Sequence, residues 1–422
     1  MSRVAVHTLG CKLNFAETAT IARQFTDRGF TVVGLDDSAD VVVLNTCSVT
    51  ERADRECRQL VRRALRHSPD AYVVILGCYA QLQPATLAAI PGVDLVLGTK
   101  EKFDVFQHAD WVKKERARTA VTPIKEVDTF HNAMSFCTIP LARGRSRSVS
   151  PPVLLNDAAC LVGQGYKEIV LTGVNVGDYG KHLGSSLLAL LQQLETIDGL
   201  ERIRVSSIEP NLLSDELIDF WLGSAKLCKH FHIPLQSGSD PILRGMRRRY
   251  RREWYADRLD RIKSLFPKAG IGSDVIVGFP GETYTFFQET YRFLVDQPVS
   301  YLHVFTFSER PNTPANDFMD KVEPGMRAQR SEQLRILSAR KRRAFSEGFV
   351  GSIVDVLFES GADDGLETGL SNEYLRVSVS SPNRLENNIL PVKIEDVSDD
   401  GCFGTVCSSF ASSKKKEATV PW

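Results

Sequence analysis

Short β-branched apolar runs alternate with amphipathic segments through the N-terminal part of the chain. The apolar runs are residues 3–8, 30–33, 40–46, 72–77 and 94–98. Apolar residues at helical spacing occupy 16–28, 51–66 and 81–90. Runs of this kind are typical of buried parallel strands. The pattern therefore predicts a doubly wound α/β domain over residues 1–103.

A second strand–helix alternation follows a charged, irregular stretch at 104–127, which we interpret as a linker. The predicted strands are KEIVLTG (167–173), RIRVSSI (202–208), HFHIPL (230–235), GSDVIVGF (272–279) and YLHVFTF (301–307). The helices ahead of them are expected at 153–164, 185–197, 214–222, 252–264 and 283–295. With a basic helix at about 325–347, this predicts an α/β domain over 128–347, built as a full or partial β/α barrel.

The last part of the chain changes to alternation of apolar and polar residues. Segments such as SIVDVLFES and LPVKIEDV are separated by Gly, Asp and Asn. This predicts a small antiparallel β-barrel or sandwich over 348–411, followed by a basic tail at 412–422. Small barrels of this type often bind RNA, and a structural cap is equally compatible with the pattern.

Composition and charge narrow the class of protein. Hydrophobic residues make up 43% and charged residues 25% of the 422 residues, as in ordinary globular proteins. No apolar run is long enough to span a bilayer and no leader is visible, so we expect a cytoplasmic protein without membrane contact. The net charge is zero, which by itself indicates no nucleic-acid partner.

Arginine clusters are the exception to this neutrality. They could neutralise phosphates, although any single cluster is more often a solvated helix face. Two clusters carry the candidate RNA-binding residues, Arg143, Arg145, Arg147, Arg247, Arg248 and Arg249.

Three cysteines follow predicted strands of the first domain at their carboxyl ends: Cys11, Cys47 and Cys78. Functional groups gather at this edge of a parallel sheet, so the three thiols favour a shared metal or cluster site over buried free thiols. Zinc sites usually contain cysteines paired at short spacing, which these are not. The wide spacing therefore favours an iron–sulfur cluster held by three loops.

The strands of the second domain also end in polar residues, which predicts a cleft at that end of the barrel. The candidate cofactor-binding residues, chosen by their position at strand ends, are Asn175, Ser207, Glu209 and Gln236.

These segments together resemble the methylthiotransferases of the radical S-adenosylmethionine superfamily. TLGCKLN, LNTCSVTERAD and LGCYAQ are similar to the family's three-cysteine N-terminal domain. FCTIPLARGRSRS, EIVLTGVNVGDYG, RVSSIEP, IPLQSGSD, DVIVGFPGET and HVFTFSERPNTPA are similar to its radical domain. The C-terminal β unit resembles its TRAM domain. TLGCKLN looks most like the branch that acts on threonylcarbamoyladenosine in tRNA.

The resemblance implies a transferase that adds a methylthio group to C2 of threonylcarbamoyladenosine beside the anticodon, with the tRNA anticodon stem-loop as partner. Cys11, Cys47 and Cys78 would hold an auxiliary 4Fe-4S cluster. A second 4Fe-4S cluster would bind S-adenosylmethionine and generate the radical, and Asn175, Ser207, Glu209 and Gln236 are the candidates for contacting that molecule. A monomer is expected. The sequence identifies neither the sulfur donor nor the electron donor, and it assigns no catalytic residue.

The chain departs from the family at the radical cluster. The family has a CxxxCxxC loop after the first barrel strand, and only its last cysteine is visible, as Cys137. The other two positions are Met134 and Phe130, and no apolar strand precedes them. This predicts an internal gap that removed the first strand and two cysteines together, so that one cluster forms and the radical is generated poorly. The alternatives are a non-catalytic tRNA-binding relative that keeps one cluster, a methylthiotransferase of the isopentenyladenosine branch, or an unrelated zinc protein.

Overall fold

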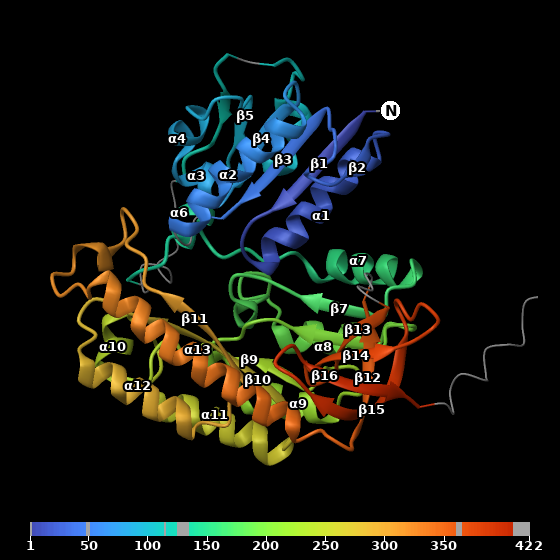
Figure 1. The fold of residues 1–422 in the computed structure, drawn as a ribbon, viewed down its shortest axis with the longest axis vertical. Coiled ribbons are helices and arrows are strands. Elements are labelled where there is room, and N and C mark those ends of the chain that lie inside the picture. Colours follow the sequence, from blue (N-terminus) through green and yellow to red (C-terminus); the bar gives the residue numbers. More distant parts are fainter. Residues whose placement is uncertain (1, 48–50, 114, 125–134, 360–364, 408–422) are drawn as a thin grey trace, which may run out of the picture.

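The computed structural model describes residues 2–47, 51–113, 115–124, 135–359 and 365–407. Figure 1 shows an N-terminal α/β domain above a larger α/β domain, with a C-terminal β-barrel at the side of the larger domain. This arrangement confirms the predicted fold class. Among the described residues, no helix has both the length and the apolar character needed to cross a membrane.

The N-terminal domain is a parallel sheet in the order β2-β1-β3-β4-β5-β6. Its strands are β1 Arg3–Thr8, β2 Thr31–Val33, β3 Val41–Thr46, β4 Tyr72–Gly77, β5 Leu95–Leu97 and β6 Arg118–Ala120. Its helices are α1 Lys12–Thr26, α2 Glu51–His67, α3 Cys78–Leu82, α4 Pro84–Ala88 and α5 Val105–His108, with a 3-10 turn η1 Glu101–Phe103.

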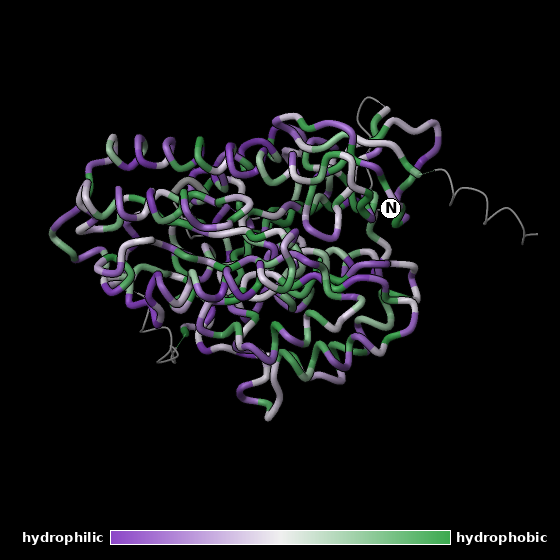
Figure 2. The backbone as a smooth tube through the Cα atoms, turned by 90° about the horizontal axis from the view of Figure 1, so that it is seen from below, coloured by the Kyte–Doolittle hydropathy of each residue, from purple (hydrophilic) through white to green (hydrophobic). Residues whose placement is uncertain are grey.

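Alternate residues of these strands face opposite sides of the sheet and enter two separate cores. Val42 and Leu44 pack with residues of α2, whereas Val41 and Val43 pack with residues of α1. Both faces are therefore covered by helices, as the apolar runs predict. Figure 2 shows hydrophilic and hydrophobic residues alternating along the coiled segments, as expected for helices with one buried side.

The prediction that residues 104–127 form a linker is wrong in part, because α5 and β6 of the first domain lie in this range. The strand β6 pairs with β5 in parallel and extends the sheet. Trp111 packs on the aromatic rings of Phe25 and Phe106. An edge strand as short and polar as RTA gives no apolar signal, which is why the sequence pattern missed it.

The central domain follows the predicted alternation closely. Its strands are β7 Glu168–Leu171, β8 Arg202–Val205, β9 His230–His232, β10 Gly270–Val277 and β11 Tyr301–Thr306. Its helices are α6 Ile139–Arg143, α7 Pro151–Gly163, α8 Leu187–Glu195, α9 Asp215–Gly223, α10 Asp240–Gly245, α11 Arg252–Leu265, α12 Tyr284–Asp296 and α13 Pro324–Glu347. The 3-10 turns are η3 Val176–Asp178, η4 Pro210–Leu212 and η5 Pro314–Asp317.

The five strands are parallel and form a curved, incomplete barrel. β7 pairs with β8, and β9, β10 and β11 pair in that spatial order. A parallel bridge from Ile203 to Leu227 connects the two groups. Within the described part of the chain, no strand pairs with the other edge of β7, and its Val170 is 42% exposed. In the part of the chain that the structure describes, no strand therefore occupies the place of the first barrel strand, as the sequence predicts.

The C-terminal unit is a closed barrel in the order β12-β13-β14-β16-β15. Its strands are β12 Ile353–Phe358, β13 Leu366–Ser371, β14 Arg376–Ser380, β15 Ile389–Val397 and β16 Cys402–Val406. Two details differ from the prediction. β14 and β16 pair in parallel rather than antiparallel. The strand β13, LETGLS, was not predicted because it is polar and contains Gly369, where a Cβ would lie 2.3 Å from the Leu357 carbonyl oxygen.

Candidate metal centre and active site

The three N-terminal cysteines meet at one edge of the first sheet. Cys11 follows β1, Cys47 follows β3 and Cys78 begins α3 directly after β4, and these three strands are neighbours. Gly10, with a φ of 106°, allows the loops to approach each other. A Cβ on Gly10 would lie 2.4 Å from the Cβ of Cys47, so only glycine fits between the first two loops.

The cysteine edge combines buried thiols with cations. Burial raises the pKa of the Cys78 thiol, while Arg143 and Lys102 partly oppose this shift, and the nearby Cys11 raises it further. Cys11 is exposed and Cys47 and Cys78 are buried. Thiols beside arginine and lysine ionise more readily, as iron coordination requires. The residues present therefore fit a cluster bound by three thiolates, Cys11, Cys47 and Cys78.

Arg143 binds this edge from the central domain. Its Nη1 donates to Glu17 Oε1 at 2.8 Å, and its Nη2 donates to Asn14 Oδ1 at 2.8 Å and to Glu17 Oε2 at 3.1 Å. Lys102, which is 1% exposed, forms an ion pair with the same carboxylate. Arg143 is a predicted RNA-binding residue, yet its guanidinium points into the cysteine edge. Asn14, Glu17 and Lys102 gave no such signal, since their convergence depends on tertiary structure.

We expect this contact to weaken in acid. Burial alone would raise the pKa of Glu17, but hydrogen bonds and charge from Arg143 and Lys102 lower it below its ordinary value of 4.5. A carboxylate with a depressed folded pKa stabilises the fold above 4.5, and the stabilisation is lost as the pH falls through the folded pKa.

Glu17→Gln should therefore lower the free energy of unfolding by about 2 kcal/mol at pH 7 and flatten its dependence on pH below 4.5. Urea unfolding at a series of pH values checks this. The exposed Glu56→Gln serves as the control, and parallel pH profiles for Glu17→Gln and the unaltered chain would contradict the expectation.

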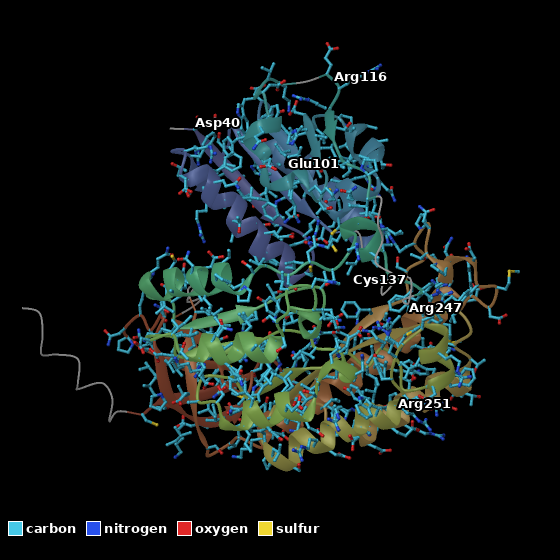
Figure 3. The ribbon with its side chains drawn as sticks, turned by 180° about the vertical axis from the view of Figure 1, so that it is seen from behind. Asp40, Glu101, Arg116, Cys137, Arg247 and Arg251 are labelled. Atoms are coloured by element: carbon cyan, nitrogen blue, oxygen red, sulfur yellow. The ribbon has the colours of Figure 1, made fainter. Side chains whose placement is uncertain are left out.

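Cys137 lies between the N-terminal domain and the barrel (Figure 3). The backbone of Ser135 accepts from Ala315, and its hydroxyl donates to the Gly245 carbonyl at 2.8 Å, which fixes the segment. Burial raises the pKa of the Cys137 thiol, and the charges of Arg248, Cys78 and Glu209 also reach it. Cys137 is therefore placed between the three-cysteine edge and the mouth of the barrel.

The residues at Cys137 do not fit a cluster that needs three thiolates in a CxxxCxxC loop. The two other positions are Met134 and Phe130, and neither side chain provides a thiolate. Both lie outside the described residues.

The four candidate cofactor residues lie at the carboxyl ends of successive strands. Ser207 Oγ lies 2.6 Å from Nδ1 of His232. Glu209 Oε1 accepts from Arg248 Nη1 at 2.9 Å. The backbone of Gln236, with a φ of 68°, bonds to Asp274 and Ile276 of β10. The structure thus gathers three of the four around the mouth of β8, β9 and β10, and their contact with S-adenosylmethionine stays a prediction.

Asn175 lies apart from these three, on a cavity of about 450 Å³ beside the unpaired edge of β7. Its Nδ2 donates to Asp178 at 2.8 Å. The same cavity is lined by Arg143 and by Ile169 and Leu171 of β7. Ile169 and Leu171, which are partly buried against the hydrophobic core, therefore also line this cavity.

The remaining candidate arginines fall into two groups. Arg145 and Arg147 are exposed and line a cavity of about 830 Å³ together with Lys100. Arg247 and Arg249 are exposed on the central domain. Arg248 differs, because it forms an ion pair with Glu209 and its guanidinium lies 5.4 Å from the ring centre of Phe136.

Comparison with known proteins identifies the family. The profile described as uncharacterized protein family UPF0004 matches residues 3–98, and that of the Radical SAM superfamily matches 135–294. The threonylcarbamoyladenosine tRNA methylthiotransferase MtaB of Bacillus subtilis is 38% identical over 93% of this chain and 94% of its own. The protein of the same name from Aquifex aeolicus is 38% identical over 82% of this chain and 90% of its own.

This chain belongs to the threonylcarbamoyladenosine tRNA methylthiotransferase family. It is a transferase of the radical S-adenosylmethionine class, with a 4Fe-4S cluster and S-adenosylmethionine as the family's cofactors. The alignment with the Bacillus subtilis relative runs over 423 residues but covers only 93% of this 422-residue chain, so the relative has residues without a counterpart here. The Radical SAM match also begins only at Ser135. Both findings agree with an internal gap in this methylthiotransferase.

Solved structures support the fold. The radical S-adenosylmethionine methyltransferase TsrM from Kitasatospora setae superposes with a TM-score of 0.51, covering 87% of this chain and 81% of its own at 14% identity. At that identity the likeness concerns the fold alone. The methylthiotransferase chain thus shares its α/β architecture with this radical S-adenosylmethionine protein.

Proposed function

We propose that this chain acts on tRNA and adds a methylthio group to C2 of threonylcarbamoyladenosine next to the anticodon, with low activity because Met134 and Phe130 stand where the radical cluster needs thiolates. The contact that carries the proposal is the bond of Arg143 to Glu17 and Asn14, which holds the three-cysteine edge against the segment that follows Cys137. The three-cysteine edge, where the sulfur chemistry would take place, therefore lies beside the mouth of the barrel. Action on tRNA would place the protein in the cytoplasm.

In this proposal three groups of side chains have different roles. Cys11, Cys47 and Cys78 hold the auxiliary cluster, which when bound supplies an open iron for sulfur. Lys102 and Arg143 balance the negative charge of the thiolates. Asn175, Ser207, Glu209 and Gln236 contact S-adenosylmethionine.

A second function is favoured by the absence of thiolates at positions 130 and 134. Without them the chain would bind tRNA through its exposed arginines and keep one cluster, but would not modify the nucleoside. The cysteine edge and the C-terminal barrel support this reading equally well, so the experiment must separate binding from modification.

The test compares two chains in a strain that lacks its own threonylcarbamoyladenosine methylthiotransferase. One is the unaltered chain, and the other carries the Bacillus subtilis relative's residues at the junction ahead of Ser135. Mass spectrometry of tRNA nucleosides should detect the methylthio product with the second chain and little with the first. If the second chain also gives no methylthio product, threonylcarbamoyladenosine is not the substrate. Full modification by the unaltered chain would show that the missing thiolates do not limit its activity.

We expect Arg145 and Arg147 to contact phosphate. Replacing both with glutamine should weaken tRNA binding by roughly tenfold and reduce the slope of log Kd against log salt by about two. Filter binding at several salt concentrations measures both quantities. The control replaces Arg335 and Arg340, two exposed residues of α13, with glutamine and so removes the same charge elsewhere. An equal loss of tRNA affinity in this control would argue against a direct contact of Arg145 and Arg147 with phosphate.

A further inference from the structure

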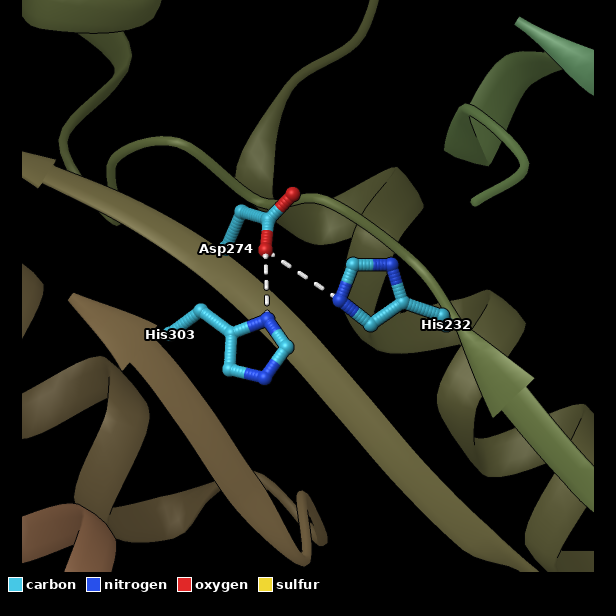
Figure 4. Close-up of side chains that lie close together, drawn as sticks. All are labelled: His232, Asp274 and His303. Carbon is cyan, nitrogen blue, oxygen red and sulfur yellow. Dashed lines mark hydrogen bonds and ion pairs between the residues drawn. The ribbon is translucent and has the colours of Figure 1, made fainter. Parts of the chain in front are cut away.

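Two imidazoles and one carboxylate converge inside the barrel, away from the cysteines. They come from three adjacent parallel strands, His232 from β9, Asp274 from β10 and His303 from β11 (Figure 4). The register pairs Asp274 with His303, and pairs His232 with Gly272, two residues before Asp274. Side chains two residues apart on a strand share a face, so all three point to the same side of the sheet.

The distances between their ligand atoms suit a single ion. Asp274 Oδ1 lies 3.1 Å from His232 Nε2 and 3.3 Å from His303 Nδ1. One possible ligand atom from each of the three residues lies within 4.8 Å of the others. The carboxylate is thus shared between two rings rather than bound to one partner.

His232 is oriented as metal-binding histidines are. Its Nδ1 contacts the hydroxyl of Ser207 at 2.6 Å, which fixes the ring. Its Nε2 is buried, and no described residue gives it a well-directed hydrogen bond, despite the close charge contact with Asp274. A ligand histidine typically has its second nitrogen held by such a polar partner while the other nitrogen faces the ion.

The surroundings leave the cluster available for a cation. The neighbouring His230 ring is buried, and its Nε2 lies 2.8 Å from the hydroxyl of Tyr301. The nearby guanidinium of Arg204 is paired with Glu168 through its Nε, at 2.7 Å.

We propose that His232, Asp274 and His303 bind one divalent transition-metal ion. Two imidazoles with one carboxylate suit zinc, cobalt or iron(II) rather than magnesium or calcium, which prefer oxygen ligands. His303 is 49% exposed, so the ion would keep open positions toward solvent. The site goes beyond the proposed tRNA function and uses none of the cysteines assigned to it.

Cobalt(II) provides a direct test on the full chain after chelation and without iron reconstitution. We expect the histidine–carboxylate site to bind one equivalent with visible d–d absorption, separate from the sulfur charge-transfer band that cobalt bound to the three cysteines would give. His303→Ala should weaken binding by about tenfold or more. This side chain is half exposed, so the variant should fold, and exposed His182→Ala is the matched control.

A variant with Cys11, Cys47 and Cys78 all changed to alanine separates the two kinds of site. It should lose any sulfur charge-transfer band and retain one equivalent of cobalt with the d–d absorption and affinity of the histidine–carboxylate site. The proposal is overturned if cobalt does not bind the unaltered chain, if His303→Ala and Asp274→Asn bind it normally, or if the triple cysteine variant loses the d–d absorption.

Discussion

Anaerobic reconstitution with iron and sulfide should load about four iron atoms onto each chain, rather than the about eight of a protein with two 4Fe-4S clusters. Cys11, Cys47 and Cys78 lie on adjacent strand ends and fit one cluster. At the second site Cys137 is accompanied by methionine and phenylalanine in the sequence. One thiolate is a weak anchor for a cubane cluster, so we expect no second cluster to persist.

Two exposed cysteines provide a matched comparison for this experiment. Cys11→Ser should remove most of the bound iron, whereas Cys160→Ser on α7 should leave it unchanged. Cys137→Ser should also leave about four irons in place. Iron analysis with the visible absorption spectrum measures each case. About eight irons on the unaltered chain, or a large loss in Cys137→Ser, would show that a second cluster forms.

Replacing Arg204 with methionine should cost about 3 kcal/mol of stability, because it removes the shorter of the two arginine contacts of the Glu168 carboxylate and leaves only Arg202 at 3.9 Å. Arg204 is 2% exposed, and its Nε donates to Glu168 Oε1 at 2.7 Å. Its Nη2 donates to the Ser371 carbonyl at 3.0 Å, at the turn between β13 and β14. One guanidinium therefore joins the edge of the incomplete barrel to the C-terminal barrel, which lie side by side in Figure 1.

The same turn makes a second contact beside Arg204. Tyr374, which has a φ of 76°, stacks on the ring of His230 with centroids 4.2 Å apart. Loss of Arg204 should therefore also loosen the C-terminal barrel, which limited proteolysis detects as faster cleavage between the two units. The contact explains why the C-terminal barrel is fixed against β8 and β9.

Urea unfolding of Arg204→Met and Arg343→Met compares the same substitution in two environments. Arg343 pairs with Glu347 on the surface of α13, with both side chains about half exposed, and should contribute far less to stability than Arg204. Equal shifts in the two variants would contradict a special role for Arg204. Because several domains unfold, the transition of the central and C-terminal units should be fitted separately.

Local patterns predicted most of the elements because each strand and helix is encoded within a few residues. The apolar runs at 41–46 and 72–77 identify buried strands, and the predicted helices of the central domain start and end within about two residues of the expected positions. The short helices α5, α6 and α10 were not predicted, and the exceptions among the strands are β6 and β13. Both are short or polar, so their strand character comes from the neighbour they pair with.

The residues of the candidate site were also predicted only in part. The cysteines were predicted because they share one position relative to successive strands, and the sheet order then places those strand ends side by side. Arg143 and Arg248 were grouped with RNA-binding arginines by charge alone, whereas the structure pairs them with Glu17 and Glu209. Arg143 and its partner Glu17 lie more than a hundred residues apart in the sequence. A local sequence pattern cannot predict such a pair, because it depends on how distant segments pack.

The sequence by itself determined the parallel α/β architecture, the three-cysteine edge and the loss of thiolates around Cys137, since these follow from periodicity and residue identity. Only the tertiary structure decided that Arg143 binds the cysteine edge, that Arg204 fastens the C-terminal barrel, and that His232, Asp274 and His303 converge. The physical reason is that strand register and domain docking bring side chains from distant segments into contact, and those contacts depend on the shape of the folded chain.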